Sequence, residues 1–131
     1  MHRVLIETWV SYYPDRDEPT NPYRCPISNS LKQDPDVIRV FTSYEFIAFN
    51  YQSSRESLKW KTPLYARVFI RMAHAYELGL SSEPPAPFML QLRESDLIER
   101  YWMGPPIQDK IAPGPPIIRR PVNRSVRILP S

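Results

Sequence analysis

Proline constrains this chain more than any other residue type. The 131 residues include sixteen prolines and only three glycines. Because proline fixes φ and removes a backbone hydrogen-bond donor, the irregular segments are expected to be extended and semi-rigid. Five prolines between residues 14 and 35 predict a long loop on the surface, whereas residues 36–49 contain no proline, glycine or asparagine. Regular structure is therefore expected to begin after the loop.

Composition and charge exclude several classes of protein. The 42% hydrophobic and 12% aromatic content is enough for the core of one modest domain. The net charge of +3 comes from residues 110–131, which hold five Lys/Arg and no Asp/Glu. One cysteine, Cys25, excludes an internal disulfide, and two histidines are too few for a zinc-ligand cluster. No apolar run predicts a membrane span, and neither a signal peptide nor a transit peptide is recognisable.

A first helix is predicted after Asp34 and Pro35. The aspartate side chain caps free N–H groups, and proline suits the first helical position. Apolar residues then recur at helical spacing, at positions 37, 40, 41, 44, 47, 48 and 51. Valine, isoleucine and phenylalanine also favour strands, but an uninterrupted strand over residues 36–49 would be unusually long. We therefore expect a helix.

Two further start signals follow. The pair Ser53 and Glu56 is typical of a capping box and predicts a short helix through Trp60. Thr62, as a cap, and Pro63 predict the start of the clearest helix, which the glycine at position 79 ends.

The expected fold class is mainly α, with stacked helix hairpins, an extended proline-rich loop and a C-terminal tail. Residues 1–83 are expected to form a helical domain that includes the loop 14–35. Residues 84–109 are predicted to be a linker plus a short helix from about Arg93 to Met103, and residues 110–131 an extended basic tail. For residues 3–12, strand and helix remain equally open.

Few residues suggest catalysis or metal binding. His74 follows two arginines on one helix face, without a carboxylate to orient it, and is read as a structural histidine. The carboxylates Glu94, Asp96 and Glu99 suit the first turn of a helix, where the helix dipole favours negative charge. Cys25 has no partner motif, and no phosphate-binding glycine pattern is present. We therefore expect no catalytic residue, no cofactor, no metal and no enzymatic activity.

The C-terminal tail is the predicted partner-binding segment. Aliphatic residues interleave with arginines in it, which suits an extended strand lying in a protein groove. The alternative is that the arginines bind nucleic-acid phosphates. The predicted partner-binding residues are Trp102, Ile117, Ile118, Arg119, Arg120, Arg124 and Arg127.

Residues 8–83 contain, in order, the blocks TWVSYY, DPDVIRVF, SRESLKWK and LYARVFIRMAHAYELGLSSE. This order resembles mitochondrial cytochrome c oxidase subunit Va, the fungal subunit VI. The chain departs from that family in the proline-rich stretch 14–35, which replaces a helix, and in residues 84–131, which have no counterpart there. The matching positions are Trp9, Val10, Tyr12, Pro35, Val37, Ile38, Tyr65, Glu77, Leu78 and Gly79.

The resemblance implies an all-α peripheral domain on the matrix side of the mitochondrial inner membrane, in contact with neighbouring subunits but not with haem or copper. The function expected on this basis is that of a non-catalytic accessory subunit of cytochrome c oxidase, respiratory complex IV, in the electron-transport chain. Its partners would be other subunits of the complex, with no small-molecule substrate and with membrane contact peripheral at most. Two alternatives are a structural protein of another large particle, such as a virion or a ribosome, and a nucleic-acid-binding adaptor.

Overall fold

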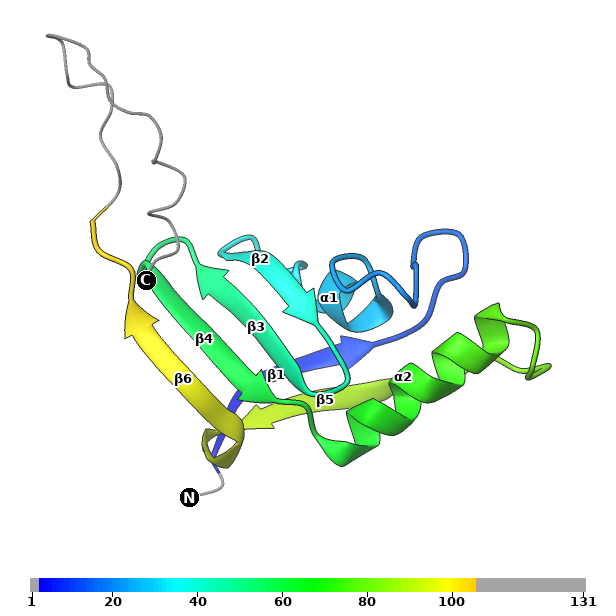
Figure 1. Cartoon of the computed structure of the whole chain (residues 1–131). Helices are drawn as coiled ribbons and strands as arrows, with labels where there is room; N and C mark the ends of the chain where they lie inside the picture. Colours follow the sequence, from blue (N-terminus) through cyan, green and yellow to red (C-terminus); the bar gives the residue numbers. More distant parts are fainter. Residues whose placement is uncertain (1–2, 106–131) are drawn as a thin grey trace, which may run out of the picture.

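The computed structural model describes residues 3–105, which form two antiparallel sheets and two short helices (Figure 1). In the two-stranded sheet, β1 (Val4–Val10) pairs with β5 (Phe88–Arg93). The four-stranded sheet has the order β2-β3-β4-β6 and consists of β2 (Val37–Thr42), β3 (Phe46–Tyr51), β4 (Glu56–Lys61) and β6 (Leu97–Trp102). The helices are α1 (Pro26–Leu31), α2 (Leu64–Glu77) and the 3-10 turn η1 (Glu94–Asp96). The predicted mainly α, helical fold of stacked hairpins is therefore wrong, because the chain is mainly β.

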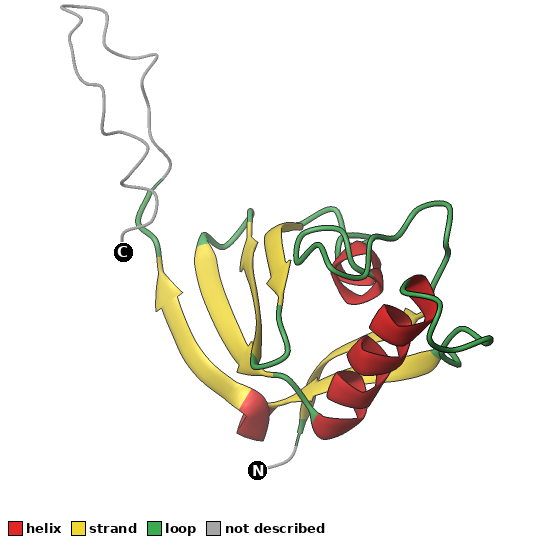
Figure 2. Ribbon diagram, turned by 45° about the vertical axis from the view of Figure 1, so that its right-hand side comes forward, coloured by secondary structure: helices red, strands yellow, loops and turns green. Residues whose placement is uncertain are grey.

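The core lies between the two sheets, and both helices lie on the same side of the four-stranded sheet (Figure 2). Trp60 and Phe49, from neighbouring strands, stack with ring centres 6.2 Å apart. From the opposite side, Leu90 and Leu92 of β5 and Ile27 of α1 are completely buried. Each buried aliphatic side chain of this size contributes about 1.5–3 kcal/mol. Each sheet has one apolar face that must be buried. These side chains bury the two faces against each other and so form a single core.

The segment predicted as the first helix forms the β2–β3 hairpin. Arg39 adopts φ +56°, and the pairing register shifts between Ile38 and Phe41. This bulge adds one residue to β2, so Val37 and Val40, three positions apart, are both buried. The turn at residues 43–45 then shifts the alternation of buried and exposed side chains once more. Bulge and turn together give the apolar residues a spacing that resembles a helix.

Two other predicted helices, at residues 53–60 and 93–103, are also replaced by strands. Ser53 does not cap a helix: its backbone N–H and its hydroxyl each donate to the Asp36 carboxylate at 2.7 Å. This contact closes a turn, after which Glu56 begins β4, paired along its length with β3. The predicted helix from Arg93 to Met103 is replaced by η1 and β6, and β6 pairs with β4. The residues that were read as helix caps thus form hydrogen bonds in turns instead, because the same side-chain types favour both.

One sequence prediction is confirmed in outline: α2 occupies the segment for which the clearest helix was predicted. Residues 3–12, for which strand and helix were both left open, include the strand β1. Gly79 adopts φ +79° directly after the helix end, as expected of a C′ glycine. Thr62 does not cap the helix. Its hydroxyl donates to the Ser43 carbonyl oxygen at 3.0 Å and so ties the β2–β3 turn to the start of α2.

The proline-rich loop is held by one buried carboxylate. Asp17 is only 4% exposed. Its oxygens accept hydrogen bonds from the Tyr13 backbone N–H at 2.7 Å, from Arg16 Nε at 2.7 Å and from Asn29 Nδ2 at 2.6 Å. Because Asn29 belongs to α1, Asp17 connects the loop to that helix. Neither helix within residues 3–105 has the length and apolar character of a membrane span.

Candidate functional site

One side of α2 is apolar and exposed. The side chains of Leu64, Tyr65, Val68 and Met72 are 73%, 45%, 50% and 46% exposed; Leu64, Val68 and Met72 follow one another at intervals of about one turn, and Tyr65 lies beside Leu64. We call these four residues the α2 face. The opposite side of the helix buries Ala66, Phe69 and Ala73 in the core. Most surface helices have one apolar side, whereas α2 has a second apolar side that stays largely exposed, although Tyr65 at its margin contacts β5.

A tyrosine holds α2 against the two-stranded sheet. The Tyr65 hydroxyl donates to the Gln91 carbonyl oxygen at 3.0 Å and accepts from the Gln91 N–H at 2.9 Å. Gln91 lies on the edge of β5 that is not paired with β1. The hydroxyl therefore satisfies both groups of a strand edge that would otherwise be open. Met89 and its cross-strand partner Trp9 are also exposed, in the two-stranded sheet.

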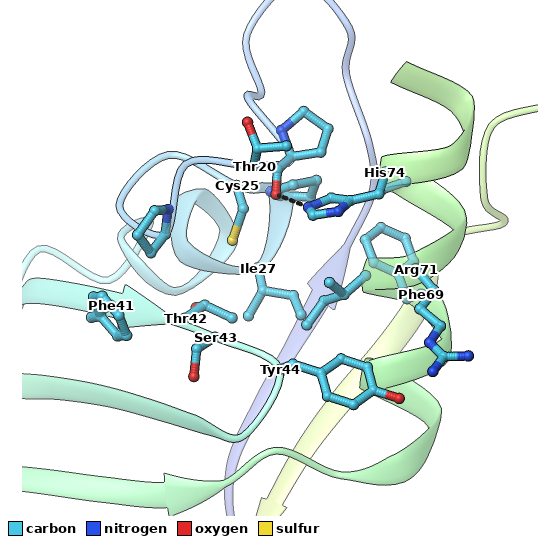
Figure 3. A pocket seen from close by; sticks show the side chains of 15 residues that line it. Thr20, Cys25, Ile27, Phe41, Thr42, Ser43, Tyr44, Phe69, Arg71 and His74 are labelled. Atoms are coloured by element: carbon cyan, nitrogen blue, oxygen red, sulfur yellow. Dashed lines mark hydrogen bonds between the residues drawn. The ribbon is translucent and has the colours of Figure 1, made fainter. Parts of the chain in front are cut away.

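A cavity of about 430 Å³ lies on the other flank of α2, between that helix, the loop before α1, the start of α1 and the β2–β3 turn (Figure 3). Small-molecule sites have volumes of about 300–1,000 Å³. The cavity is mainly apolar, with Ile27, Phe69 and Ala73 among its buried wall residues. Pro19 and Pro22 form part of the wall in the loop.

The polar side of the cavity is positively charged. Arg71 lines the cavity, and its guanidinium carbon lies 5.4 Å from the centre of the Tyr44 ring, within cation–π distance. The guanidinium carbon of Arg67, which is not a wall residue, lies 5.2 Å from the same ring. His74 Nε2 lies 3.1 Å from the Pro19 carbonyl oxygen and carries the proton in that hydrogen bond (Figure 3). Among the described residues, no Asp or Glu lines the cavity.

A second, smaller groove of about 280 Å³ lies between β1, α1 and β3. Tyr51 lines it, and burial raises the pKa of the Tyr51 hydroxyl, with further increases from Asp34, Asp36 and Glu56.

Of the predicted partner-binding residues, only Trp102 is described. It ends β6 with 64% of its surface exposed. Ile117, Ile118, Arg119, Arg120, Arg124 and Arg127 lie outside the described residues. Sequence reasoning did not single out the α2 face. The available signal was a helix in which Arg67, Arg71 and His74 form the only polar stripe, because such a helix has more apolar surface than one contact with the core can cover.

The carboxylates weighed as catalytic candidates lie apart. Asp96 accepts a hydrogen bond from the Arg93 backbone N–H at 2.9 Å, and Glu94 forms an exposed ion pair of 3.9 Å with Arg3. Glu99 lies in β6 opposite Lys59. No group of three His, Cys, Asp or Glu side chains within residues 3–105 could hold a metal ion.

Comparison with known proteins gave no relative: no family model, curated protein or solved structure matches the chain. The class of protein is therefore defined by its fold alone, a two-sheet antiparallel β-protein with one exposed amphipathic helix.

Proposed function

We propose that this protein is a non-catalytic subunit of a larger assembly and binds another protein through the α2 face. The observation that carries the proposal is the exposure of four large apolar side chains on one side of a helix whose other side is already buried. Contiguous exposed apolar surface of this kind is typical of protein–protein contacts. An aromatic residue and a methionine within it are also enriched in such interfaces.

The charges beside the α2 face indicate which charged groups the partner's surface carries. Arg67 and Arg71 flank the face, and neither forms an ion pair with a carboxylate within the described residues. The only acidic residue of α2 is Glu77, at its last position. The matching surface is therefore apolar and bordered by Asp or Glu side chains, which would pair with the two guanidinium groups.

The assembly itself is not named by this proposal. An accessory role in cytochrome c oxidase stays a prediction, and the all-α fold that the resemblance implies is not the fold of this chain. Two of the matching positions, Val37 and Ile38, lie in β2 rather than at the start of a helix. The alternative of a nucleic-acid adaptor rests on tail residues outside the described part of the chain.

The test is the native size of the protein in extracts of its source cells, with Val68→Glu compared against Ile98→Glu. Both changes place a carboxylate at an apolar residue of nearly equal exposure, 50% and 53%, but Ile98 lies in β6. Wild type and Ile98→Glu should migrate in a particle larger than the 15.4 kDa chain, and Val68→Glu should migrate as free protein. Binding to the purified partner should weaken at least tenfold, or about 1.4 kcal/mol.

Purified Val68→Glu should keep the circular dichroism spectrum and the Tm of the wild type, since Val68 is half-exposed and does not belong to the core cluster. If Val68→Glu stays in the particle, the α2 face is not the binding surface. If purified wild type is itself a dimer that Val68→Glu dissociates, the partner is a second copy, and a role as subunit of a mixed assembly is wrong.

A further inference from the structure

The cavity beside α2 shares Arg71 with the border of the α2 face, but none of the four residues of that face lines it, and it is a candidate binding site in its own right. Its apolar walls come from four separate segments of the chain. Three of the wall residues, Ile27, Phe69 and Ala73, are at most 4% exposed, so they are fixed by core packing. An apolar group that enters the cavity meets side chains that are already in place and loses little free energy to their ordering.

The loop that forms the outer wall is also held in place. The Thr42 N–H and the Ser28 hydroxyl both donate to the Pro22 carbonyl oxygen, at 2.9 and 2.7 Å. Asp17 anchors the same loop to α1 through Asn29. The cavity is therefore preformed by hydrogen bonds as well as by packing.

The charge at the cavity mouth is not neutralised by the protein. Arg71 is exposed, its guanidinium lies over the Tyr44 ring, and it has no ion-pair partner within residues 3–105. His74 donates from Nε2 to Pro19, which leaves Nδ1 for another partner. A cationic group beside an apolar cavity without carboxylates favours a ligand that has an anionic end and an apolar body.

We propose that this cavity binds a small organic carboxylate, with its aromatic or branched aliphatic body against Ile27 and Phe69 and its carboxylate on Arg71. A guanidinium group donates two parallel hydrogen bonds to a carboxylate, which fixes the orientation of the ligand. The stacking of Arg71 on Tyr44 holds the guanidinium group near the mouth before the ligand arrives.

The experiment is an NMR titration of the full ¹⁵N-labelled chain with 4-phenylbutyrate and, separately, with the neutral analogue 4-phenylbutanol. The carboxylate should bind one to one with a Kd on the order of 1 mM or tighter, an affinity that a ligand with so few non-hydrogen atoms can reach. The largest shifts should fall on amides of the cavity wall, such as those of Ile27, Thr42 and Ala73. The alcohol should bind about tenfold more weakly, because it lacks the charge-assisted contact.

Three variants locate the binding. Arg71→Gln should weaken 4-phenylbutyrate about tenfold, and Arg71→Lys, which keeps the charge but loses the fork, should be intermediate. The matched control is Lys61→Gln, which removes the same charge from an exposed residue outside the cavity and should change Kd less than about twofold. Arg71 is exposed, so none of these changes removes a core contact.

The proposal is overturned if the shifts do not saturate, if they map to the α2 face, or if Arg71→Gln binds as tightly as wild type. It is also overturned if phenyl phosphate binds more than tenfold tighter than 4-phenylbutyrate, since the ligand class would then be a phosphate ester. The α2 face is tested separately by Val68→Glu, because Val68 does not line the cavity, whereas Arg71 lies at the border of both sites.

Discussion

Replacing Asp17 with asparagine should strongly destabilise the protein. One carboxylate oxygen of Asp17 accepts from Arg16 Nε and Asn29 Nδ2, and the other accepts from the Tyr13 N–H and Arg16 Nη2. An amide has only one oxygen, so in either orientation its NH₂ group would face two donors. The change therefore loses two hydrogen bonds to a charged acceptor and brings donors together, without altering the size of the side chain.

The magnitude follows from the burial of this group. A hydrogen bond to a charged group contributes about 1.5–3 kcal/mol. Arg16 is partly exposed, which reduces its share. Two lost bonds then correspond to about 3 kcal/mol for Asp17→Asn. For a domain of this size, that lowers Tm by about 12–24 °C.

Urea unfolding, followed by circular dichroism, measures this loss directly. The midpoint should fall with an unchanged m-value, because the surface exposed on unfolding stays the same. The control is Asp15→Asn, an exposed residue of the same loop, which should shift the free energy of unfolding by less than about 0.5 kcal/mol. If the two variants are equally stable, the loop is not held by the Asp17 carboxylate and the reasoning fails.

Three further changes test other contacts. Tyr65→Phe removes the hydroxyl that bridges both backbone groups of Gln91 and should cost about 1 kcal/mol in urea unfolding; no loss would mean that water satisfies the β5 edge equally well. Gly79→Ala should cost about 1 kcal/mol of thermal stability through its φ of +79°, since the added Cβ meets no atom within 4 Å. Burial and neighbouring carboxylates raise the pKa of Tyr51 above 10.0, so the stability that it contributes is complete below pH 10 and is lost as pH rises through the folded-state pKa. Between pH 9 and pH 11 the Tm of Tyr51→Phe should therefore fall less than the Tm of the wild type. If Tm falls equally in both proteins, the pKa of Tyr51 is not raised.

The sequence by itself determined the features that depend on neighbouring residues. Pro63 and Gly79 mark the limits of α2 closely, because a fixed φ at the start and a left-handed residue at the end act within one turn. The prolines between residues 14 and 35 produced the expected loop, interrupted only by the six-residue α1. The sequence also predicted that apolar residues cover most of the surface of α2, but it did not indicate which side of the helix would remain exposed.

Only the tertiary structure decided the fold class and the candidate sites. Over residues 36–51 the apolar spacing fits a helix and equally a hairpin with a bulge at Arg39, and pairing of β3 with β4 selects the hairpin. The pairing of β1 with β5 joins residues that are 78 to 89 positions apart, from Val10 with Phe88 to Val4 with Arg93, and no local signal encodes such a contact. The cavity likewise brings Pro19 and His74 together across 55 positions. Strand pairing and packing act between distant segments, so local propensity could indicate where regular structure lies but not which surfaces it would cover.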